Sequence, residues 1–122
     1  MYKLLLIALA GAMGSVTRYA LSSLIQRRAD LDWPVGTFCV NLAGCFIAGI
    51  VAGVLVDRLT MREEFRLAIG VGFLGGFTTF SALGVETFNL LRGGQTVTAI
   101  AYATASVVAG VAAVAVGFKL AV

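Results

Sequence analysis

A chain of 122 residues that is 60% hydrophobic and only 12% charged is not a soluble domain, because one core of this size could not bury so much apolar surface. The length instead allows about four membrane spans of roughly 20 residues, so we expect an all-α integral membrane protein. The net charge of +3 does not predict nucleic-acid binding, because no basic cluster exceeds Arg27 and Arg28 and such charges anchor helix ends at lipid headgroups. The lack of histidine excludes imidazole metal sites and Ser-His catalysis.

Apolar stretches predict where the helices cross the membrane. The first stretch ends before a basic pair, after which Trp33 suits the membrane interface and Pro34 can open a second helix. Residues 57–64 hold the densest charge and separate the second stretch from the third, and a glycine pair predicts a tight turn before the fourth. We treat residues 1–122 as one transmembrane domain, with spans at about residues 4–24, 35–56, 65–91 and 96–120.

Lysine and arginine are divided almost evenly between the two sides that four spans define. A clear excess on one side would set the orientation of the chain, because these residues are enriched in cytoplasmic loops. So slight a bias is compatible with insertion in both orientations, followed by antiparallel pairing of two copies. Five of these residues lie on the side of both termini, namely Lys3, Arg58, Arg62, Arg66 and Lys119, whereas Arg27, Arg28 and Arg92 lie opposite, with Arg18 nearer that second side.

Small residues recur at helical spacing, as in the row Gly44, Ala48 and Ala52. Such rows let helices approach closely in a bilayer, where the hydrophobic effect gives no drive between them. Because four short spans enclose little volume, we expect the chain to associate with a second copy.

Residues 72–81 interrupt the third apolar stretch with paired glycines and three hydroxyls, in the order Gly-Phe-Leu-Gly-Gly-Phe-Thr-Thr-Phe-Ser. Glycine lets a chain leave helical geometry, and unwound backbone persists at bilayer depth only when it is buried in protein or lines a wet cavity. A broken helix exposes carbonyls and half-helix ends that hold ions. We therefore predict an ion site and a helix break near Gly75 and Gly76. The phenylalanine rings there either pack or turn their electropositive edges toward an anion.

Polar residues also recur on the second and fourth stretches. Thr37 and Asn41 share one helical face, and the Asn41 amide either bonds to a neighbouring helix or offers an N–H to an anion. Tyr102 and Ser106 form a second polar row, although a serine can also bond back to its own helix.

Two charges lie far from the predicted helix ends. Arg18 either extends to the interface or attracts anions at a vestibule, and Glu86 either faces water or pairs with an arginine. Neutral donors with few acids suit a small anion better than a cation or a proton relay. Fluoride illustrates the requirement, because a compact and strongly hydrated ion needs closely placed donors in place of its water.

Three motifs together resemble the fluoride channels of the CrcB (Fluc) family, and they follow one another in the family's order over nearly the whole chain. The first is Gly-Ser-Val-Thr-Arg-Tyr at residues 14–19, and the second is Gly-Thr-Phe-Cys-Val-Asn-Leu-Ala-Gly at residues 36–44. The third comprises residues 72–81 with Glu86.

The resemblance implies an antiparallel, dual-topology homodimer in a bacterial inner membrane, with two fluoride pathways. It also implies a structural sodium ion at the dimer centre, held by the backbone carbonyls of Gly75 and Thr78 from each copy. Fluoride would flow passively down its gradient, which exports the toxic anion without nucleotide or proton coupling. The expected pathway residues are Asn41, Phe80, Ser81, Tyr102, Ser106, Thr37 and Thr79, with Arg18 and Glu86 at the vestibule.

The chain departs from the family pattern at two places. Leu83 stands where the family usually has a second phenylalanine, and leucine has no positive ring edge to offer an anion. Gly110 and Val114 stand where relatives often carry hydroxyls, so the polar row on the fourth stretch is thinner.

Two other classes of membrane protein are compatible with four spans. A small multidrug/proton antiporter needs an embedded acid in its first span, where this chain has Arg18, and Glu86 in the third span is a poor substitute. A non-transporting membrane assembly subunit would need only the small-residue rows, and it leaves Asn41 and the hydroxyl-rich interruption unexplained. We expect no enzyme, because no nucleophile–base pair is apparent.

Overall fold

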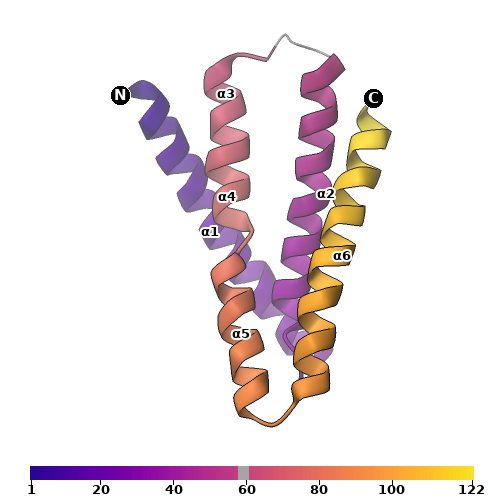
Figure 1. Cartoon of the computed structure of the whole chain (residues 1–122). Helices are drawn as coiled ribbons and strands as arrows, with labels where there is room; N and C mark the ends of the chain where they lie inside the picture. Colours follow the sequence, from indigo (N-terminus) through magenta and orange to yellow (C-terminus); the bar gives the residue numbers. More distant parts are fainter. Residues whose placement is uncertain (58–60) are drawn as a thin grey trace.

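The computed structural model describes residues 1–57 and 61–122 and is helical almost throughout (Figure 1). Four of its helical segments are long and apolar enough to cross a membrane. Arg58, which we counted in the charge balance, lies outside the described residues. The elements are α1 (Tyr2–Ala29), α2 (Val35–Asp57), α3 (Glu63–Leu67), the π-helix η1 (Ala68–Leu74), α4 (Gly75–Phe77), α5 (Phe80–Arg92) and α6 (Thr96–Ala121).

The expectation of an all-helical membrane protein with an interrupted third span is confirmed. The helices run longer than the stretches chosen by hydropathy. α1, for example, continues through its basic pair to Ala29 and ends at Asp30, whose left-handed backbone has φ 49°. Helices extend past the hydrocarbon region because interfacial residues still favour helical hydrogen bonds, whereas hydropathy locates only the apolar part.

The third helix is interrupted at Thr78 and Thr79, after the glycine pair that we expected to break it. Gly75 and Gly76 are helical, and Gly76 lies so close to α1 that an added Cβ would overlap the carbonyl of Gly11. The glycine pair therefore contributes to close helix packing, at least through Gly76. The prediction placed the break too early, because hydrogen bonds from another helix, rather than glycine flexibility, hold the extended residues.

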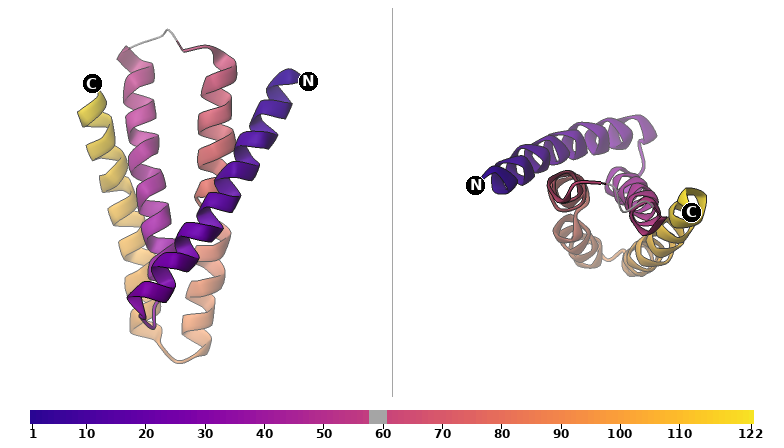
Figure 2. Two further views of the ribbon diagram at one scale, coloured as in Figure 1. Left: turned by 180° about the vertical axis from the view of Figure 1, so that it is seen from behind. Right: turned by 90° about the horizontal axis from the view of Figure 1, so that it is seen from above.

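Helices α2 and α6 lie side by side and close enough for backbone contact (Figure 1). An added Cβ at Gly49 would overlap the Val114 carbonyl, and one at Gly117 would overlap the Phe46 carbonyl. Helix α1 crosses the bundle obliquely, as Figure 2 shows, and packs on η1 and α4. Both termini lie at the end of the molecule where α2 ends and α3 begins (Figure 1).

Buried apolar residues gather at the opposite end of the molecule. Leu90, Ala99 and Tyr102 form a cluster, against which Trp33 and Leu83 pack. The Trp33 ring meets Tyr102 with centroids 6.2 Å apart. This cluster joins the α1–α2 connection to α5 and α6, and thereby holds the half-helix α5 against α6. Most other large apolar side chains face outward, as expected for a protein whose solvent is lipid.

Candidate functional site

The interruption brings two helix ends together. Thr78 (φ −90°, ψ 155°) and Thr79 (φ −148°, ψ 116°) are extended. The Thr78 amide and hydroxyl both donate to the carbonyl of Leu74, at 3.0 and 2.8 Å, and so close the first half-helix. Thr79 begins the second half, because its Oγ1 accepts from the Ala82 amide at 3.1 Å as an N-cap.

Asn41 on α2 bonds to both polar groups of the Thr79 backbone. Its Nδ2 donates to the Thr79 carbonyl at 3.1 Å, and its Oδ1 accepts from the Thr79 amide at 2.8 Å. The amide thus replaces the helical partners that an extended residue loses at bilayer depth. Nδ2 carries two hydrogens, and no described residue engages the second one. The structure therefore shows the interhelical bond, and the second Nδ2 hydrogen has no partner among the described residues.

A cavity of about 670 Å³ opens beside the interruption. Its wall is largely apolar and comes from α2, η1, α4, α5 and α6. The cavity brings together candidates from the second and third motifs and from the polar row of the fourth stretch, which spacing alone could not place against one another. Its lining includes Asn41, Gly75, Thr78, Thr79, Phe80 and Ser106, and also Leu83, Gly110 and Val114, the positions at which the chain departs from the family pattern.

The described residues leave one candidate in this cavity without a hydrogen-bond partner and another mostly uncovered. Ser106 Oγ is enclosed, and no described residue bonds to it. An unsatisfied buried hydroxyl is costly, so this group needs a partner from elsewhere. Phe80 is 85% exposed although it adjoins the interruption. Ser81, which follows it, shares a 3.2 Å hydrogen bond with the Thr79 hydroxyl.

Glu86 is held by two hydroxyls rather than by an arginine. Its Oε1 accepts from Thr37 and its Oε2 from Tyr102, each at 2.7 Å. Thr37 is 9% exposed and Tyr102 is 3% exposed, so helices α2, α5 and α6 meet at this carboxylate. Both hydroxyl protons point at Glu86, and neither is directed at the larger cavity.

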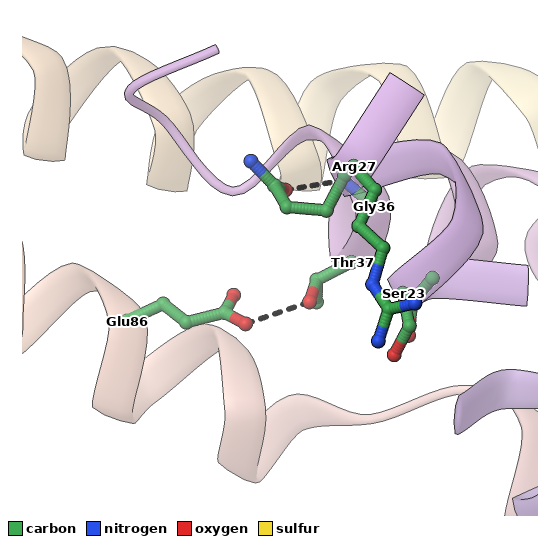
Figure 3. Close-up of a pocket in the computed structure, with 7 residues that line it drawn as sticks. Ser23, Arg27, Gly36, Thr37 and Glu86 are labelled. Carbon is green, nitrogen blue, oxygen red and sulfur yellow. Dashed lines mark hydrogen bonds between the residues drawn. The ribbon is translucent and has the colours of Figure 1, made fainter. Parts of the chain in front are cut away.

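A second cavity, of about 330 Å³, adjoins the Thr37–Glu86 hydrogen bond (Figure 3). Figure 3 shows Glu86 and Thr37 facing each other, with Ser23 and Arg27 of α1 close to Thr37. The lining is polar, and Gln26 fixes its edge by accepting from the Gly36 amide at 3.0 Å. Our sequence candidates did not include the four α1 residues of this lining. The sequence pattern could have identified them, because polar residues at helical spacing share one face of α1: Ser22, Ser23, Gln26 and Arg27.

The two expected vestibule residues lie apart. Glu86 lines the smaller cavity, together with Arg27. Arg18 does not line it; instead its Nε donates to the Gly76 carbonyl at 3.0 Å. The charge that accompanies Glu86 at this cavity therefore comes from the end of α1, and Arg18 belongs to the interruption.

The residues expected to hold sodium offer suitable oxygens. Gly75 and Thr78 both line the larger cavity, and no described residue donates to the Thr78 carbonyl. Residues 1–57 and 61–122 contain no cluster of three His, Cys, Asp or Glu side chains that could hold a metal ion. The expected sodium ligands are therefore backbone carbonyl oxygens. Such oxygens suit a hard cation, but two of them from one copy do not complete a coordination shell.

The fold and the site define a multi-pass membrane protein whose third span is interrupted beside a cavity. The family described as "CrcB-like protein, Camphor Resistance (CrcB)" matches residues 5–118, and the chain belongs to it. A "Fluoride-specific ion channel FluC" of Methylobacillus flagellatus is 43% identical over 122 residues, which cover 98% of this chain and 94% of the relative. Proteins of the same name from Chloroflexus aurantiacus (43% over 120 residues, 98% and 95%) and Aquifex aeolicus (40% over 114 residues, 93% and 92%) are also similar.

Proposed function

We propose that this protein is a fluoride-selective passive channel of the bacterial cytoplasmic membrane. Relatives at 40–43% identity over more than nine-tenths of the chain carry the name of that function. The observation that carries the proposal is the cavity in which uncharged donors of Asn41 and Ser106 adjoin an interrupted helix. Neutral donors stabilise a dehydrated anion without binding it so tightly that conduction stops. The protein moves an ion and is not an enzyme.

A second copy completes the pathway in this proposal. Along the larger cavity, the Ser106 hydroxyl has no hydrogen-bond partner among the described residues. The Phe80 ring is exposed there, and the apolar wall is open. A copy inserted in the opposite orientation would cover this wall while each copy retains its own donors. The near-even charge balance supports such dual topology, since neither orientation is strongly favoured.

The same pairing provides a place for the structural sodium ion. The carbonyls of Gly75 and Thr78 from both copies would together supply an oxygen shell at the dimer centre. A cation bound there stabilises the extended backbone of both copies at once. The sodium ion would thus bind the interrupted helices of both copies, whereas fluoride would contact the surrounding side chains.

Fluoride would enter from the polar cavity, where Arg27 lies with Ser23 near Thr37. The guanidinium raises the local anion concentration. Farther in, the free N–H of Asn41 and the hydroxyls of Ser106 and Ser81 replace lost water, and the edge of the Phe80 ring faces the ion. Leu83 adds no positive edge at this point, so the hydroxyls and the amide carry most of the stabilisation.

Fluoride efflux from liposomes tests the proposal most directly. The purified protein is reconstituted, and external fluoride is followed with a selective electrode under a potassium diffusion potential. We expect rapid fluoride release and no matching release from chloride-loaded vesicles. Equal chloride release, or efflux that requires a proton gradient, would contradict a passive fluoride channel. Cysteine pairs that cross-link only in antiparallel dimers would test the assembly.

A further inference from the structure

Arg18 is a charged residue whose partner in the described structure is a backbone carbonyl. Its half-buried side chain donates from Nε to the Gly76 carbonyl at 3.0 Å, and no carboxylate among the described residues pairs with it. Gly76 belongs to the last turn of a half-helix that ends at Phe77, where the carbonyls lack helical partners. The C-terminal end of a helix also carries partial negative charge, which favours a cation there.

The packing of α1 explains why this bond forms. Gly11, Gly14 and Arg18 lie on one helical face, at steps of three and four residues. An added Cβ at Gly14 would overlap the Phe73 carbonyl, and one at Gly76 would overlap the Gly11 carbonyl. The two helices therefore touch through their backbones, which sets the distance over which Arg18 reaches Gly76.

Arg18 and Asn41 hold the two sides of the interruption from different helices. Arg18 binds the carbonyl of Gly76, in the last turn of the first half-helix, and Asn41 binds the backbone of Thr79, where the second half begins. Between them lies the Thr78 carbonyl, to which no described residue donates. Fixing the residues on both sides fixes the direction of this carbonyl.

We propose that Arg18 is a positioning residue that holds the end of the half-helix formed by residues 63–77 and thereby sets the geometry of Thr78 and Thr79. This role differs from attracting anions at a vestibule. It rests on contacts within one copy, so it stands independently of the sodium ion and of the conducted species.

Hydrogen exchange measured by mass spectrometry tests this role in the full-length protein in lipid vesicles. Arg18→Met removes the donor and the charge, and Arg28→Met removes an equal charge from the exposed end of α1 as the control. We expect amides of residues 74–82 to exchange roughly tenfold faster in Arg18→Met, since a charge-assisted hydrogen bond is lost, and to be unchanged in Arg28→Met. Unchanged exchange in Arg18→Met would overturn the proposal.

Arg18→Lys serves where Arg18→Met fails to assemble, because it keeps the charge but replaces the rigid planar Nε–H donor with an ammonium on a flexible stem. Exchange at residues 74–82 is again expected to be faster than in wild type, and wild-type exchange would overturn the proposal. Fluoride efflux gives a second readout. If Arg18 is a positioning residue, Arg18→Met is expected to reduce the rate of fluoride efflux by the same factor at low and at high ionic strength. A reduction that disappears at high salt would indicate anion attraction and overturn the proposal. A wild-type protein without fluoride flux would contradict the channel and leave the exchange test intact.

Discussion

Asn41 binds Thr79 through both halves of its amide, with Nδ2 to the carbonyl at 3.1 Å and Oδ1 to the backbone amide at 2.8 Å. One side chain on α2 thus supplies the hydrogen bonds that an extended residue would otherwise lack within a membrane span. Asn41 also lines the larger cavity. In the proposed channel, Asn41 therefore both supports the extended backbone and contacts the anion, so a single substitution is expected to affect both.

Asn41→Asp is expected to reduce fluoride efflux at least about tenfold, because the carboxylate cannot donate to the Thr79 carbonyl and repels the anion. Electrode recordings of liposome efflux measure the effect. Asn89→Asp, at an exposed position on α5, is the matched control and is expected to conduct normally. Normal efflux through Asn41→Asp would show that Asn41 has no part in the pathway.

Ser106→Ala separates conduction from stability. The Ser106 hydroxyl is buried and has no partner among the described residues, so its removal is expected to leave the free energy of unfolding unchanged or to raise it by up to about 1 kcal/mol. Fluoride efflux is nonetheless expected to fall, because the pathway loses a donor. Thr104→Val, on an exposed part of the same helix, is the control for both measurements. A strong loss of stability without loss of efflux would make Ser106 a structural residue.

Tyr102→Phe and Thr37→Val each remove one hydroxyl from the Glu86 carboxylate. Hydrogen bonds to charged groups contribute about 1.5–3 kcal/mol, so each variant is expected to unfold at a lower temperature than wild type. Tyr19→Phe, at an exposed tyrosine of α1, is the control. Because both variants unpair the same carboxylate, the double variant is expected to deviate from additivity. Additive effects would mean that the two hydroxyls do not share Glu86.

Gly49→Ala is expected to destabilise the protein by about 1–3 kcal/mol, because the added methyl group overlaps the Val114 carbonyl where α2 meets α6. Gly84→Ala provides the contrast, since nothing lies within 4 Å of an added Cβ there. It is expected to stabilise α5 by about 0.5–1 kcal/mol through helix propensity. Thermal unfolding in detergent measures both. A destabilised Gly84→Ala would instead indicate that a second copy covers this face of α5.

Hydropathy and composition were sufficient to predict the class of fold, because a bilayer accepts few structures and an apolar chain of this length fits four helices. The pattern of residues 72–81 likewise predicted an interruption of the third helix, since hydroxyls and paired glycines are unfavourable in an uninterrupted apolar span. Both results follow from local physical chemistry, for which sequence is enough.

Contacts between helices determined where the interruption falls and which groups the site residues bind. The interruption falls at Thr78 and Thr79 because Asn41, distant in sequence, replaces the lost backbone bonds, whereas Gly76 is used for packing on α1. Glu86 on α5 accepts hydrogen bonds from hydroxyls of α2 and α6, and Arg18 on α1 donates to a carbonyl of α4. Residue types limited the possible partners, but which groups come within hydrogen-bond distance of one another depends on helix crossing geometry, which no local pattern encodes.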